Sequence, residues 1–148
     1  MDPRGQAALR AMYPECDGKR LSESMPQARW IFLLYGNLCA MCSRRDAFVA
    51  ADNLWYPVEG RPDLRQGSDV YVAFGRPTGD RGSYMQWLEG GIPLTVVFEI
   101  LSPVSTAEEM DAKFAFYRRT RCRGVLHLRP APQHSPNIHA PFDETLSQ

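Results

Sequence analysis

Two carboxylates fall at positions where they could do chemistry together. Glu99 lies inside the almost wholly apolar run from residue 94 to residue 101, where an aliphatic side chain would be expected. A carboxylate buried in a strand is stable only when it is paired or bound to a metal. Asp69 opens the preceding predicted strand, residues 69–74. If the strands are neighbours, the pair offers oxygen ligands suited to Mg²⁺ or Mn²⁺.

A bound divalent ion would lower the pKa of a water molecule and neutralise charge on a phosphate. Lys113, in the next predicted helix, could act there as a point charge. Glu23, at the start of an earlier predicted helix, could reach the same cleft. Simpler roles stay open: Glu99 paired with an arginine, Lys113 on a solvated helix face, and Glu23 complementing a helix dipole.

The other chemical residues give weaker signals. Cys39 and Cys42 form a C-x-x-C pair with no second pair or nearby histidine to complete a zinc site, and we predict that they pack in the core. A thiol-based function remains the weakest hypothesis. Arg76 and Arg81 are candidates for contact with DNA phosphates. We expect no shared metal site among His127, His134 and His139.

The elements that must position these residues follow from periodicity and breakers. We expect an irregular stretch over residues 1–20 and a helix from 22 to about 42. One or two strands follow at 47–56, and further strands at 69–74 and 94–101. The long polar loop at 75–91 could hold a short helix around residues 84–88. Ser105 or Thr106 can cap a helix that runs to about residue 119, and 125–128 forms a last strand. This order predicts an α/β (α+β) fold with a mixed sheet flanked by helices.

Composition limits the function classes. The chain has 148 residues, which fits a single domain over 1–148. Its 17 basic and 17 acidic residues give no global positive field, so any nucleic-acid binding must depend on a local patch. No apolar run is long enough to cross a bilayer, so we expect no membrane partner. Without a secretory signal, we expect reduced cysteines and a cytoplasmic location.

The chain resembles the Uma-two family of restriction-endonuclease-like proteins in three places. They are FVAADNLWYPVEGRPDLRQGSDVYVAFGRPTGDRGSYMQW at 48–87, VVFEILSP at 96–103, and the spacing of Lys113 and Tyr117. The resemblance covers about residues 13–119. It implies a PD-(D/E)XK nuclease fold, Mg²⁺-dependent hydrolysis of DNA phosphodiester bonds, and a homodimer.

The resemblance also assigns roles to individual residues. It implies that Asp69 and Glu99 bind the metal, that Ser102 completes a Glu-x-x-Ser motif, and that Glu23 supports the site. Lys113 then takes the place of the usual motif lysine, whose position holds Leu101. Ser68 stands where the family usually has proline. A catalytically inactive remnant, or an interaction module of the same fold, is the alternative to an active endonuclease.

The resemblance stops near Thr120. The family continues with a string such as Gly-Val-Glu-Glu-Tyr-Tyr-Ile-Tyr-Asp-Pro, whereas residues 121–130 read RCRGVLHLRP. One set of codons encodes both strings in neighbouring frames. We therefore hypothesise that residues 121–148 are read in a shifted frame and form an irregular tail, although 125–128 could still fill a strand position. The DNA sequence of the gene tests this directly.

Overall fold

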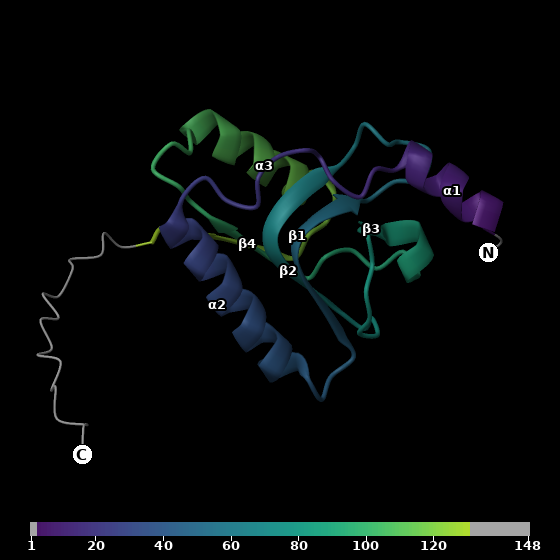
Figure 1. Ribbon diagram of the computed structural model, residues 1–148, viewed down its shortest axis with the longest axis horizontal. Coiled ribbons are helices and arrows are strands. Elements are labelled where there is room, and N and C mark those ends of the chain that lie inside the picture. The colour runs from purple at the N-terminus through teal and green to yellow at the C-terminus, as the bar shows by residue number, and fades with distance from the viewer. Residues whose placement is uncertain (1–2, 131–148) are drawn as a thin grey trace, which may run out of the picture.

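A mixed five-stranded sheet with helices on both faces forms the protein, and the computed structural model describes residues 3–130 (Figure 1). The strands run in the order β3-β1-β2-β4-β5 across the sheet. They are β1 (Ala47–Tyr56), β2 (Gln66–Phe74), β3 (Ser83–Met85), β4 (Val96–Ile100) and β5 (Gly124–Leu128). β2 is antiparallel to both β1 and β4, whereas β3 and β5 are parallel to their neighbours.

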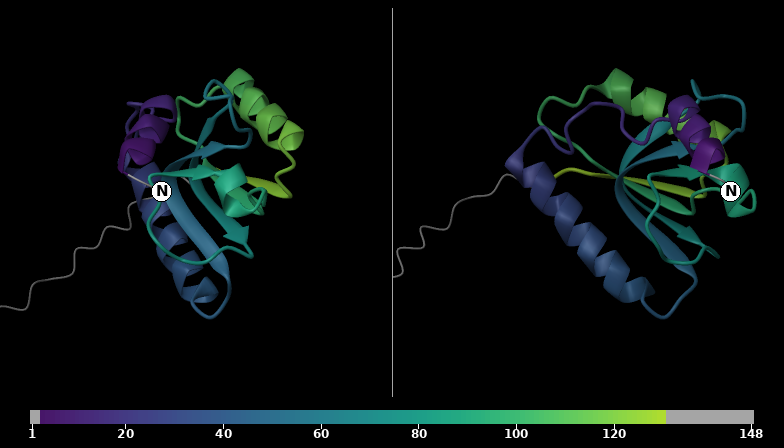
Figure 2. Two further views of the ribbon diagram at one scale, coloured as in Figure 1. Left: turned by 90° about the vertical axis from the view of Figure 1, so that its right-hand side faces the viewer. Right: turned by 45° about the vertical axis from the view of Figure 1, so that its right-hand side comes forward.

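Two long helices cover opposite faces of this sheet, as Figure 2 shows. α2 (Met25–Cys42) packs on one face through Ile31, Leu34 and Leu38. α3 (Ala107–Arg119) packs on the other through Phe116 and Tyr117. Trp55 of β1 is fully buried under α3, and its ring lies parallel to that of Tyr117 with centroids 6.3 Å apart.

Both long helices begin where their sequences place a cap. The Ser24 hydroxyl accepts a hydrogen bond from the Gln27 N–H, and Pro26 occupies the first turn, where a missing N–H is harmless. Thr106 and Glu109 form a reciprocal capping box at α3. Within residues 3–130, no helix has the length and apolar character needed to span a bilayer.

Two predictions about the chain need correction. Residues 1–20 were expected to be irregular, which is wrong for α1 (Pro3–Met12). Leu9 of α1 packs on Tyr13, Leu54 and Tyr56, and such tertiary contacts do not show in local periodicity. The loop at 75–91 holds the short helix expected around residues 84–88, which is the 3₁₀ helix η1 (Gln86–Glu89), but strand β3 within it was not expected. Residues 131–148, with His134, His139 and most of the proposed tail, lie outside the described residues.

The β5 strand lies where the last strand was expected and pairs with β4 from Val96↔Gly124 to Ile100↔Leu128. It is an edge strand, and its residues are half-buried or exposed. The reading-frame hypothesis for residues 121–148 stays a prediction.

The Gln27 side chain ties the start of α2 to the end of β4. Gln27, which is buried, donates from Nε2 to the Ile100 carbonyl (2.9 Å) and accepts from the Glu23 N–H (2.8 Å). Removing a buried side chain with two such bonds leaves both partners unpaired.

We therefore expect Gln27→Ala to lower the free energy of unfolding by about 1–3 kcal/mol. Asn37→Ala, at an exposed position of the same helix, should change it by less than about 0.5 kcal/mol. Urea unfolding followed by circular dichroism measures both. Equal stability of the two variants would show that Gln27 does not fasten α2 to β4.

Candidate metal and phosphate site

Asp69 and Glu99 face each other across neighbouring strands. The β2–β4 register pairs Val70 with Phe98 and Tyr71 with Val97, so continuing it by one residue sets Asp69 opposite Glu99. Directly opposed residues in an antiparallel pair point to the same face of the sheet, with Cβ atoms about 5 Å apart. This is the α3 face, because Tyr71 and Val97 belong to the core beneath that helix. The two carboxylates therefore converge, as the sequence predicted.

Glu99 is held on both of its oxygens by α3. The Lys113 Nζ donates to Oε2 at 2.6 Å, and the Tyr117 hydroxyl donates to Oε1. Lys113 and Tyr117 are one helical turn apart, so both reach the same carboxylate. Glu99 is completely buried. Burial raises the pKa of Glu99 above its ordinary value, against the opposing effects of Lys113 and Tyr117.

The partners of Glu99 are shifted in turn. Burial lowers the pKa of Lys113, but Glu99 more than offsets this and holds it above the ordinary lysine value. Burial, and then Glu99, raise the pKa of Tyr117 well above its ordinary value, so its hydroxyl remains a neutral donor. The same hydroxyl shares a 2.8 Å hydrogen bond with Ser68. Ser68, Tyr117 and Glu99 thus form a buried polar chain beside Asp69.

Asp69 is held more loosely. Its Oδ2 accepts the Ile100 N–H at 2.6 Å. Burial, and then the neighbouring charge of Glu99, raise its pKa from 3.8 to about 6, and Lys113 opposes this. Two carboxylates that converge in a buried place disfavour each other's ionisation. A divalent cation would relieve that repulsion, and the oxygen donors suit Mg²⁺ or Mn²⁺.

Few side chains of the described residues are available to bind a metal ion at this site. Within residues 3–130, no group of three or more His, Cys, Asp or Glu side chains is placed to hold a metal ion. Mg²⁺ commonly binds one or two carboxylates and keeps several waters, so a pair such as Asp69 and Glu99 fits it. The Lys113 ammonium already neutralises Glu99, and a metal ion would compete with it.

A cavity of about 430 Å³ opens beside these residues, between α3, the ends of β2 and β4, and the segment before α2. Asp69, Glu99, Lys113 and Glu23 all line it. Ser102 lies just behind, where its hydroxyl donates to Glu23 Oε2 at 2.6 Å and shares a 3.1 Å bond with Ser105. The five residues predicted from sequence are therefore brought to one end of the sheet.

Sequence reasoning missed two residues at this place. Tyr117 was noted only for its spacing from Lys113, and its hydrogen bond to Glu99 has no local sequence signal. Asp52 lines the same cavity from β1 and has φ +47°, a left-handed backbone that an aspartate within a strand rarely adopts. Burial, and then Asp17, raise the pKa of Asp52. Strain of this kind clusters at functional sites.

Other candidates lie away from the cavity. Arg76 and Arg81 donate to the buried Glu89 at 2.8 and 2.6 Å, and the Arg81 guanidinium lies 4.0 Å from the centre of the Phe48 ring. Both guanidiniums are thus used to fasten the 75–91 loop. Cys39 and Cys42 are free thiols, and the predicted core packing holds for Cys42, which is buried against Ala47 and Val72, whereas Cys39 is only half-buried. His127 pairs with Glu99 in the sheet register but is exposed at the edge.

Comparison with known proteins found no match: no family model, no curated protein and no solved structure resembles the chain closely enough to identify a family. The site must therefore be argued from its own geometry.

The pKa of Asp69 gives a stability prediction whose sign can be worked out. Because the folded-state pKa is above the unfolded value, the native state binds more protons between about pH 4 and pH 6. Stability of the metal-free protein should therefore fall as the pH rises through this window. A shift of roughly two units corresponds to about 2–3 kcal/mol above pH 6.

Asp69→Asn removes this charge and keeps an oxygen for the Ile100 N–H. In EDTA at pH 8 we expect it to raise the free energy of unfolding by about 1–2 kcal/mol and to flatten its pH dependence. Asp63→Asn is the control, since Asp63 is an exposed partner of Arg61 and its pKa is lowered by that hydrogen bond. This variant should not raise the free energy of unfolding. Urea titrations from pH 4.5 to 8 compare them. If Asp69→Asn instead lowers the free energy of unfolding, the charge of Asp69 does not destabilise the metal-free protein.

Proposed function

We propose that this protein is a Mg²⁺-dependent endonuclease that hydrolyses DNA phosphodiester bonds at the site formed by Asp69, Glu99 and Lys113. The observation that carries the proposal is the convergence of two buried carboxylates and one lysine on a single cavity. The sheet with helices on both faces is compatible with the PD-(D/E)XK fold that the family resemblance implies. That resemblance also implies a homodimer, which we retain as part of the proposal.

Each residue has a defined part in the proposed reaction. Asp69 and Glu99 would hold the divalent cation, which supplies an activated water and charge neutralisation at the scissile phosphate. Tyr117 fixes the orientation of Glu99 through Oε1. Lys113, released from Glu99, would place its charge beside the phosphate, where negative charge develops. Glu23 and Ser102 hold the start of α2 against the end of β4 and so support the wall of the cavity.

Removing a metal ligand tests the activity. Glu99→Gln should lower Mg²⁺-dependent cleavage of a plasmid by roughly 10²–10³-fold, the loss typical of a group that stabilises transition-state charge. Glu108→Gln, in the first turn of α3 and outside the cavity lining, is the matched control and should retain full activity. If wild type and Glu99→Gln cleave at the same rate, Glu99 has no part in the reaction.

A second candidate is favoured by one observation: both Glu99 oxygens already have partners within the protein. In that case the cluster is a structural ion pair, and the fold serves as a catalytically inactive interaction module. The two candidates differ in what happens when Lys113 is removed.

Lys113→Met leaves a buried carboxylate without its counter-ion, which should destabilise the protein by about 3–5 kcal/mol in EDTA. If Glu99 can bind metal, saturating Mg²⁺ or Mn²⁺ should restore much of the lost stability, about 2.7 kcal/mol when the metal concentration is 100 times its Kd. Lys19→Met, at an exposed position, should change stability by less than about 0.5 kcal/mol under both conditions. Thermal unfolding with and without metal measures this. An instability that metal does not relieve would favour the structural ion pair.

A further inference from the structure

The cavity beside the two carboxylates is unfavourable for a polyanion as a whole. Six carboxylates and four cations line it, which leaves a formal charge of two negative. The acids are Asp17, Glu23, Asp52, Asp69, Glu99 and Glu109, and the cations are Lys19, Arg20, Lys113 and Arg119. Because the chain has no net charge, no distant positive field compensates. A phosphate-bearing substrate of this site would therefore need cations close to the mouth.

Three of the four cations that line the cavity are available to bind a phosphate group. Lys113 is paired with Glu99, but the side chains of Lys19, Arg20 and Arg119 make no salt bridge or hydrogen bond within residues 3–130, and all three are exposed. Four other arginines of the described residues, Arg10, Arg61, Arg76 and Arg81, each form a salt bridge, whereas Arg44 and Arg45 form none. Acids line the same cavity, yet these three cations remain unpaired.

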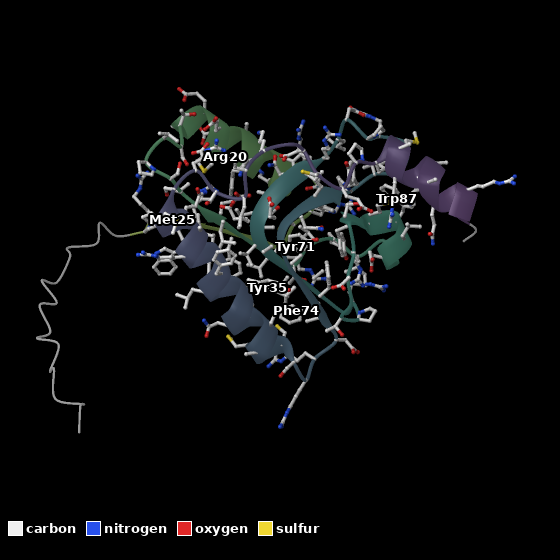
Figure 3. The ribbon with its side chains drawn as sticks, in the orientation of Figure 1. Arg20, Met25, Tyr35, Tyr71, Phe74 and Trp87 are labelled. Carbon is white, nitrogen blue, oxygen red and sulfur yellow. The ribbon has the colours of Figure 1, made fainter. Side chains whose placement is uncertain are left out.

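The three cations come from two parts of the chain. Lys19 and Arg20 lie on the segment between α1 and α2, and Arg119 is the last residue of α3. In Figure 3, Arg20 lies beside α3. Lys19 follows a tight turn in which Gly18 has φ +77° and the Asp17 carboxylate accepts the Lys19 N–H at 2.9 Å. The turn fixes where the chain carries the two cations past the cavity.

We propose that Lys19, Arg20 and Arg119 form a phosphate-binding rim that holds the sugar–phosphate backbone of DNA across the mouth of the cavity. This inference rests on the proposed function and names the contacts by which that site would take its substrate. Phosphate contacts of this kind position a nucleic acid without reading its sequence. The rim contacts the phosphates that flank the one lying over Asp69 and Glu99.

The test measures binding separately from cleavage. A fluorescein-labelled DNA duplex is titrated in EDTA, with fluorescence anisotropy recorded at several salt concentrations. The variant Arg20→Ala/Arg119→Ala is compared with Arg44→Ala/Arg45→Ala, which removes the same charge from exposed positions at the other end of α2. Thermal unfolding confirms that both variants are folded.

For the rim variant we expect the Kd at low salt to rise roughly tenfold or more, and the slope of log K against log salt to shrink by about 1.8, or 0.9 per lost phosphate contact. The control should bind within about twofold of wild type. If both variants lose the same DNA affinity, or if the salt slope of the rim variant is unchanged, the three cations do not form a phosphate-binding rim. If the wild-type protein binds DNA through the rim but does not cleave it in Mg²⁺, the rim stands and the nuclease proposal is rejected.

Discussion

The buried carboxylate of Glu99 is the constraint around which the α3 side of the protein is arranged. A charge with no exposed surface needs partners on all sides, since its desolvation is otherwise too costly. Lys113 and Tyr117 supply them from one turn of α3, and Ser68 extends the hydrogen bonds back to β2. The position of α3 over the sheet is therefore set by polar contacts as well as by apolar packing. A buried ion pair with only a structural role can often be replaced as a whole by well-packed apolar side chains without loss of stability, whereas removing one partner alone is costly.

Asp69 adds a strain that the fold alone does not explain. Like charges directly opposite on two strands are unfavourable, and here the pair is also buried. One lysine serves both groups: Lys113 bonds Glu99 directly and only lowers the pKa of Asp69 from a distance. A site that is short of positive charge and rich in oxygen donors is matched to a divalent cation. This electrostatic deficit, more than the shape of the cavity, supports the proposed metal chemistry.

Much of the site could be predicted because its residues break local rules. Glu99 interrupts an apolar strand, and Asp69 lies in the strand beside it, which begins at Gln66 and not at Asp69 as expected. The pattern pointed to both carboxylates. The capping signals at Ser105 and Thr106 located the helix that carries Lys113, but whether Lys113 faces the site or the solvent stayed open until the packing of α3 was known. Tyr117 could not be assigned a partner, because its hydrogen bond to Glu99 depends on how α3 packs. For the same reason, the pairing of Arg76 and Arg81 with Glu89 and the docking of α1 depend on long-range contacts that no local pattern contains.

Titration with Mn²⁺ by isothermal calorimetry addresses the metal site most directly, and it needs no knowledge of the substrate. If Asp69 and Glu99 form the site, the wild-type protein should bind about one Mn²⁺ per chain in a saturable step, and both Asp69→Asn and Glu99→Gln should abolish that step. Absence of saturable Mn²⁺ binding in the wild type, or binding in either variant as tight as in the wild type, would contradict the assignment.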